Sequence, residues 1–225
     1  MNGYSFAFAG TTLTALPSGA PWWDAERILV VADLHLGKSE RIARLGGTLL
    51  PPYEVTDTLL RLDDAVTRHN PATVICLGDS FDDSRAADLG DDARLWLARL
   101  MAGRRWIWIS GNHDPLPVTL GGECRAELTL ASLTFRHIAD PVATAELSGH
   151  YHPKIGVGGR TCKCFLTNRH RIILPAFGTY TGGMFCEDAP LAALAGDGAF
   201  AILTGSVARP VPVSPQRSPR ATTSR

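Results

Sequence analysis

Three short apolar runs in the first half of the chain predict buried strands. They cover residues 28–32, 73–77 and 106–110, and each ends directly before a polar or glycine-led motif. Continuous apolar runs of this length are typical of strands that are covered on both faces of a parallel sheet. We therefore expect the motifs that follow them to lie together at the carboxyl ends of neighbouring strands.

Helical periodicity separates these runs. Residues 53–68 and 91–101 place apolar side chains three and four positions apart, which is the spacing of one buried helix face. The first pattern stops at His69-Asn70-Pro71, a combination that ends helices. Alternating strands and helices indicate parallel strands joined by crossover helices, with the functional site at the carboxyl ends of the strands.

The second half of the chain has a different pattern. Residues 127–136, 161–166, 171–174 and 199–204 have strand character and are separated by Gly and Pro, without clear helices between them. At the N-terminus, the alternation of Tyr4, Phe6 and Phe8 predicts an added edge hairpin. The expected fold is α/β, with two packed mixed β-sheets flanked by helices.

Length and composition favour one domain. A chain of 225 residues with 45% hydrophobic side chains can bury a substantial core. We expect this domain to span residues 1–209. From residue 210 the chain turns to Pro, Ser, Thr and Arg, which cannot build a core, so residues 210–225 are expected to form a disordered tail.

Charge and hydropathy limit the partners. The 22 basic and 22 acidic residues balance, so no global positive field draws the protein onto a polyanion. The sequence has no apolar run near the roughly 18 residues of a membrane span and no signal-peptide pattern at its start, which favours a cytoplasmic protein without a membrane partner. The five cysteines indicate reduced thiols, and Cys162-Lys163-Cys164 is either half of a zinc site or a pair of ordinary strand thiols.

Polar motifs in a fixed order carry the candidate chemistry. Imidazole and carboxylate together suit Mn, Fe or Zn, and alternating ligands on an extended segment point to one side. A carboxylate between two ligand groups, here Asp79, is what two metals about 3.5–4 Å apart require. Each motif alone means little, and His137 is the weakest because it is a single residue, but the ordered set predicts a dinuclear metal centre. The candidate ligands are Asp33, His35, Asp79, Asn112, His137, His150 and His152.

These motifs resemble those of the calcineurin-like metallophosphoesterase superfamily, which has the four-layer sandwich of two sheets between helices. The similarity is closest to the ligase-associated DNA damage response endonucleases. It extends over roughly residues 19–205 and rests on Pro21-Trp22-Trp23, on the run of residues 29–38, on Gly78-Asp79-Ser80-Phe81, and on Leu174-Pro175-Ala176-Phe177-Gly178 with Gly182-Gly183. The resemblance implies a Mn-dependent nucleic-acid phosphodiesterase or endonuclease of DNA repair that is associated with a DNA ligase and a helicase.

The resemblance also divides the ligands between two divalent metal ions, with Mn expected and Fe, Zn or Mg as alternatives. Asp33, His35 and His152 would hold the first metal, Asn112, His137 and His150 the second, and Asp79 would bridge them. Related nucleases often carry a His three residues after the bridging Asp, where this chain has Asp82. Protein phosphatases of the superfamily have an Asp there that holds the catalytic His, which implies that Asp82 orients His113.

Two groups of residues complete the expected mechanism. His113 follows the ligand Asn112 and can protonate the leaving group after water activated by the two metals attacks the phosphate. Lys38, Arg41 and Arg44 either bind flanking phosphates or form a solvated helix face. Three functions stay open: a nucleic-acid phosphodiesterase, a phosphoesterase of small or cyclic nucleotides, and a non-catalytic scaffold.

Overall fold

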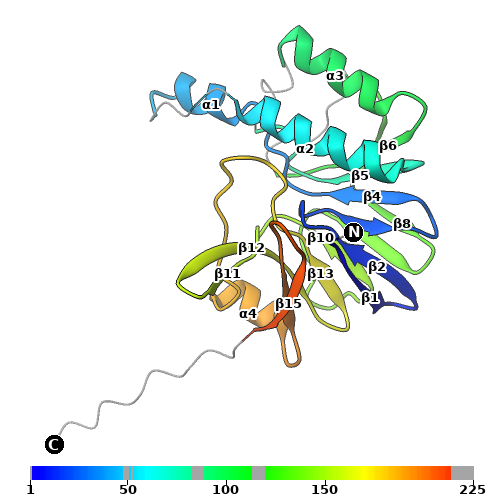
Figure 1. The fold of residues 1–225 in the computed structure, drawn as a ribbon, viewed down its shortest axis with the longest axis vertical. Helices are drawn as coiled ribbons and strands as arrows, with labels where there is room; N and C mark the ends of the chain where they lie inside the picture. The colour runs from blue at the N-terminus through cyan, green and yellow to red at the C-terminus, as the bar shows by residue number, and fades with distance from the viewer. Residues whose placement is uncertain (1, 48–50, 52, 83–88, 113–119, 214–225) are drawn as a thin grey trace, which may run out of the picture.

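A computed structural model of the chain describes residues 2–47, 51, 53–82, 89–112 and 120–213. In this part of the chain, strands form two sheets that pack face to face (Figure 1). The expectation of an α/β fold with two mixed sheets between helices is confirmed.

The first sheet has the strand order β1-β2-β3-β4-β5-β6-β7. Strands β4 to β7 run parallel to one another, whereas β1, β2 and β3 are antiparallel to their neighbours. The expected N-terminal edge hairpin is present as β1 and β2. The strands are β1 (Tyr4–Phe8), β2 (Thr11–Ala15), β3 (Pro21–Trp23), β4 (Ile28–Val31), β5 (Thr73–Leu77), β6 (Arg105–Ile109) and β7 (Glu123–Arg125).

The second sheet has the order β15-β14-β12-β13-β10-β9-β8, with β11 paired to β12. Strand β10 runs parallel to both β9 and β13, and the other pairs are antiparallel. The strands are β8 (Glu127–Leu130), β9 (Leu133–Arg136), β10 (Glu146–Ser148), β11 (Lys154–Val157), β12 (Arg160–Thr167), β13 (Arg171–Ile173), β14 (Phe200–Leu203) and β15 (Arg209–Pro212).

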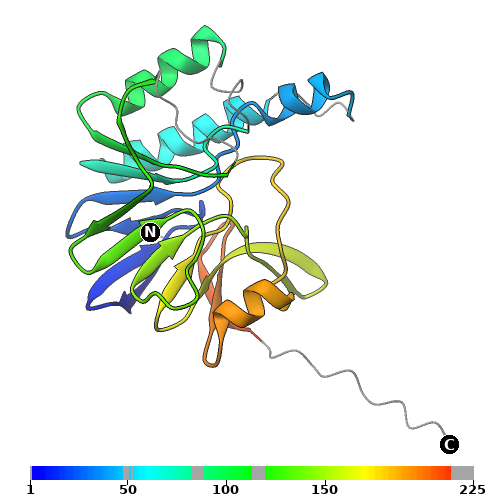
Figure 2. The ribbon, with the colours of Figure 1, turned by 180° about the vertical axis from the view of Figure 1, so that it is seen from behind.

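Helices cover the outer face of each sheet, so the molecule has four layers (Figures 1 and 2). Helices α2 (Glu54–His69) and α3 (Asp91–Met101) pack on the first sheet, and α4 (Ala189–Ala195) packs on the second. The short helix α1 (Lys38–Arg44) follows β4. Successive side chains of β4, β5 and β6 are apolar and point to opposite faces of the sheet. One face meets α2 and α3, and the other meets the second sheet, which explains the layers.

The second half contains a helix between strands where no clear helix was expected. Helix α4 was not expected from the sequence, because seven residues span only two turns and their apolar pattern is too short to show a helical period. The expected domain boundary at residue 209 coincides with the first residue of β15, which continues to Pro212 and pairs with β14. Proline is compatible with this position because β15 is an edge strand of the sheet. The rest of the expected tail, from residue 214, lies outside the described residues.

No helix in the described ranges is long and apolar enough to cross a membrane. All five cysteines lie in the described ranges and none of them is in a disulfide bond, and Cys162 and Cys164 belong to β12.

Candidate metal centre

The candidate ligands gather where strands of both sheets end. Asp33 and His35 follow β4, Asp79 follows β5, and Asn112 follows β6, so the parallel part of the first sheet delivers four of them to one edge. The second sheet delivers three more from its parallel pair β9 and β10. His137 follows β9, and His150 and His152 follow β10.

The loops that carry these ligands have an unusual backbone. Five of the ligand residues adopt the left-handed conformation, which costs a non-glycine residue about 1–3 kcal/mol. Backbone hydrogen bonds between the loops hold it in place, because His35 N donates to Asp79 O at 2.9 Å and Asp33 N donates to Gly78 O at 3.3 Å. The five residues are Asp33 (φ 54°), His35 (φ 46°), Asp79 (φ 44°), His150 (φ 70°) and His152 (φ 47°).

One cluster of ligand atoms comes from Asp33, His35 and His152, whose atoms lie within 4.8 Å of one another. His152 Nε2 lies 3.2 Å from Asp33 Oδ1. His35 Nδ1 donates to Asp82 Oδ1 at 2.9 Å, and this tautomer carries its lone pair on Nε2. We call these three residues the first cluster.

A second cluster comes from Asp79, His137 and His150, again within 4.8 Å. His137 Nδ1 donates to Leu77 O at 2.9 Å, so its Nε2 faces the other ligands. This Nε2 lies 2.9 Å from Asn112 Oδ1, 3.2 Å from His150 Nδ1 and 3.4 Å from Asp79 Oδ2. Asn112 therefore lies beside the second cluster.

The geometry of both clusters fits a cation. In the first, the buried Nε2 of His152 makes no hydrogen bond to any described residue although it faces a carboxylate at 3.2 Å. In the second, burial lowers the pKa of His137, but the hydrogen bond with Asp79 and the charges of Asp33 and Asp79 outweigh burial and raise it. The oxygens that attract a proton to His137 Nε2 would attract a metal ion to the same place.

The neighbouring His150 behaves differently. Burial and the charge of His137 lower the pKa of His150, which favours its neutral, metal-binding form. Each cluster thus contributes one carboxylate and two imidazoles, a donor set that suits Mn, Fe or Zn.

Two glycines of the motifs let the ligands approach. A Cβ on Gly78 would collide with the ring of His137, and a Cβ on Gly149 would collide with the carboxylate of Asp33. The glycine in the Gly-Asp motif therefore makes room for the second cluster, and the glycine in the Gly-His-Tyr-His motif makes room for the first.

The remaining expected residues lie around the first cluster. Asp82 is buried, and its second oxygen accepts a hydrogen bond from Arg41 Nη1 at 2.9 Å. Burial alone would raise the pKa of Asp82, but the hydrogen bonds from His35 and Arg41 outweigh it and lower the pKa. Lys38 Nζ lies 4.0 Å from Asp82, and Arg44 is exposed at the end of α1. His113, the expected partner of Asp82, lies outside the described residues.

Two basic residues near the centre were missed by the sequence analysis. Arg61 of α2 and Lys163 of β12 both donate hydrogen bonds to residues 176–181. The only sequence signal was a lysine between two cysteines in a predicted strand.

Two mixed sheets between helices, with Asp and His clusters that could hold metal ions at the carboxyl ends of their strands, are the features of a metal-binding phosphoesterase. Residues 26–167 match the calcineurin-like phosphoesterase family, and the chain belongs to this family. Among solved structures it is similar to the Pseudomonas putida nuclease MPE, with 28% identity and a TM-score of 0.72 over 93% of this chain and 100% of that one. No curated protein sequence matched the chain.

Proposed function

We propose that this phosphoesterase is a nuclease that uses two metal ions to hydrolyse phosphodiester bonds of DNA. The observation that carries the proposal is the pair of adjacent clusters, each with one Asp and two His, at the meeting edge of the two sheets. The similarity to a nuclease along nearly the whole chain supports nucleic acid as the substrate. Mn as the native metal, a cytoplasmic role in DNA repair and association with a DNA ligase and a helicase are part of the same proposal.

The protein residues have separate tasks in this proposal. Asp33, His35 and His152 would hold one ion, Asn112, His137 and His150 the other, and Asp79 both. When bound, two divalent ions neutralise charge on the phosphate and lower the pKa of water to near neutrality. Asp82 fixes the tautomer of His35 and so aims Nε2 into the first cluster.

The substrate would meet α1 and His113. Lys38 and Arg44 are proposed to bind flanking phosphates. Arg41 is proposed to combine such contact with its hydrogen bond to Asp82. His113 is proposed to protonate the leaving oxygen, oriented by Asp82 in the way that the resemblance to phosphatases implies.

A substrate panel tests the proposal. Purified protein, stripped of metal and then supplied with Mn, is offered single-stranded DNA, duplex DNA, RNA, cyclic nucleotides and a phosphomonoester in parallel. We expect chelation to abolish activity, Mn to restore it best, and DNA to be cleaved fastest. Preference for cyclic nucleotides would replace the nuclease with a small-molecule phosphodiesterase, and full activity without metal would contradict the metal centre itself.

A further inference from the structure

A short buried segment, residues 176–178, lies against the backbone of the first cluster. Phe177 N donates to Ala32 O at 2.8 Å, and Gly178 N donates to Asp33 O at 3.1 Å. The approach at Gly178 is so close that an added Cβ would collide with Leu34 O. The position of this segment therefore determines where the main chain of Asp33 can lie.

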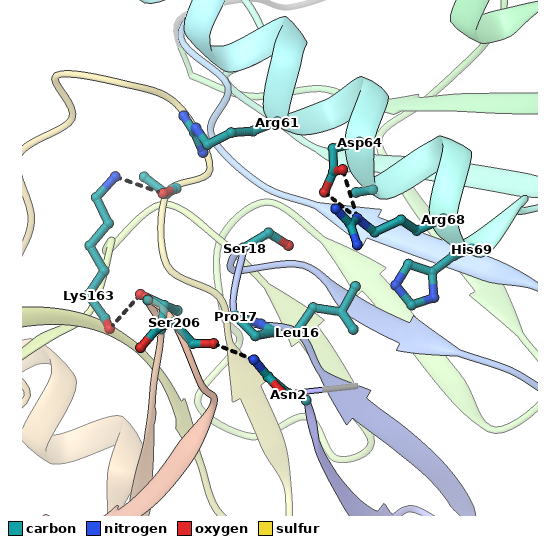
Figure 3. Close-up of a pocket in the computed structure, with 15 residues that line it drawn as sticks. Asn2, Leu16, Pro17, Ser18, Arg61, Asp64, Arg68, His69, Lys163 and Ser206 are labelled. Carbon is teal, nitrogen blue, oxygen red and sulfur yellow. Dashed lines mark hydrogen bonds and ion pairs between the residues drawn. The ribbon is translucent and has the colours of Figure 1, made fainter.

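The carbonyl groups of the same segment are bound by two cations from different layers. Lys163 Nζ, from β12, donates to Ala176 O and Gly178 O, each at 3.0 Å, while Arg61 Nη1, from α2, donates to Phe177 O at 2.6 Å. Each cation also holds the next turn, because Lys163 donates to Thr181 Oγ1 and Arg61 to Thr179 Oγ1. Both side chains border a pocket of about 760 Å³ (Figure 3).

The ammonium group of Lys163 is largely removed from water, which is unfavourable for a charged group. Burial, together with the charge of Arg61, lowers the pKa of Lys163 to about 8. A buried amine is unfavourable unless its hydrogen bonds are made, and here all three of its donors are used on residues 176–181. An apolar side chain would fill the space without this penalty, so the hydrogen bonds are the feature that distinguishes lysine at this position.

We infer that Lys163 and Arg61 are positioning residues for the first metal site. They fix three consecutive carbonyl groups of residues 176–178, and the Gly178 N–H then holds Asp33 in its left-handed conformation, with its carboxylate beside His152. This inference rests on the proposed role of Asp33 as a metal ligand. It assigns to the two cations a task that differs from contact with the substrate.

The test compares Mn affinity of the two sites in the metal-stripped protein by calorimetry and by electron paramagnetic resonance. Lys163→Met removes the donors, and we expect one ion to bind about tenfold more weakly while the other is unaffected. Lys163→Gln retains amide donors and should recover part of the loss. Lys154→Met is the matched control, because Lys154 is the cross-strand partner of Lys163 but its ammonium lies over the Phe185 ring, and it should bind as the wild type does.

The outcomes separate this inference from the proposed function. Wild-type protein that binds no ion would contradict the metal centre. Wild-type protein that binds two ions, with Lys163→Met equal to it or with both sites weakened alike, would overturn the positioning role alone. If Lys163→Met does not fold, Arg61→Lys takes its place, since it removes one of the two donors that reach residues 177 and 179 and should weaken the same single site.

Discussion

The two ligand clusters are similar in composition but are supported in different ways. Charged side chains support the first cluster. Asp82 accepts a hydrogen bond from His35 and another from Arg41, and Lys163 and Arg61 hold the segment that contacts Asp33. The second is braced by the main chain, because the Leu77 carbonyl holds His137 and the absence of a side chain at Gly78 makes room for the ring.

This difference has a physical consequence. Main-chain support is provided by the backbone at the end of a strand, so it depends on the backbone conformation there and on the space left for the ligand side chain. Support by charged side chains joins residues that are far apart in the sequence, such as His35 and Asp82, and depends on hydrogen bonds that one substitution can remove. The loss of a charged side chain behind the ligands should therefore weaken the first site more than the second.

Asp79→Asn should have the largest effect, because it is the one change that weakens both sites together. We expect losses of metal affinity and activity beyond the 10–100-fold that is common for residues behind the ligands. His35→Ala should empty mainly one site. Metal content per chain after dialysis measures both variants, and two tightly bound ions in Asp79→Asn would show that Asp79 does not bridge.

A pair of glycine variants should separate the clusters. Gly78→Ala forces Cβ against His137 in a left-handed backbone, and Gly149→Ala forces Cβ against the Asp33 carboxylate. Overpacking of this kind costs about 1–3 kcal/mol. We expect Gly78→Ala to weaken the second site and Gly149→Ala the first, as measured by Mn titration. If both variants weakened the same site, the two glycines would not support separate clusters.

Asp82→Asn should affect the first site alone. The loss of the carboxylate behind His35 is expected to lower the affinity for one ion by about 10–100-fold, with the second ion bound normally.

A double-mutant cycle tests the expected orientation of His113 by Asp82. It compares the activity of the double variant, which combines Asp82→Asn and His113→Ala, with that of each single variant. Free energies of activation that simply add would mean that these two residues act independently.

Acidification should release the second ion before the first. The pKa of His137 is raised above its ordinary value of 6.5 by the carboxylates of Asp79 and Asp33, which outweigh its burial. Protons therefore compete with the metal at His137 from a pH above 6.5 downward. Mn affinity measured between pH 8 and pH 6 should fall by several-fold at one site. An equal fall of Mn affinity at both sites would contradict the assignment of this pH dependence to His137 of the second cluster.

The smallest effect on stability and metal binding is expected from the loss of the charge of Glu123, which belongs to neither cluster. Hydrogen bonds from Arg105, and then from Arg125, lower the pKa of Glu123 to about 2. Since its folded pKa is depressed, its contribution to stability is present above pH 4.5 and is lost as the pH falls through about 2. The pair is exposed and screened, so Glu123→Gln should cost less than about 1 kcal/mol of unfolding free energy at pH 7. Metal binding should be unchanged, and a loss of either ion would show long-range coupling.

Strand ends were the part of the molecule that the sequence could predict. Asp33, Asp79 and Asn112 follow the apolar runs of β4, β5 and β6. Because these strands are parallel neighbours, their carboxyl ends lie at one edge of the sheet and bring the three residues together. The contacts behind the ligands could not be predicted in this way. Asp82 forms hydrogen bonds with His35 and Arg41, and Lys163 donates to carbonyl groups of residues 176 and 178. Such contacts depend on side-chain packing between layers, which no local pattern encodes.

The left-handed backbone at five ligand residues also limits how this centre can be redesigned. A scaffold that presented these side chains on regular strands would lack the positive φ angles of these five residues, so the side chains would leave the backbone in other directions. Glycine at these positions would relax the backbone but would remove the ligand atoms. Engineers who graft this centre would therefore need to transplant the crossed loops and their hydrogen bonds as one unit, and would start from a scaffold with several kcal/mol of stability in reserve.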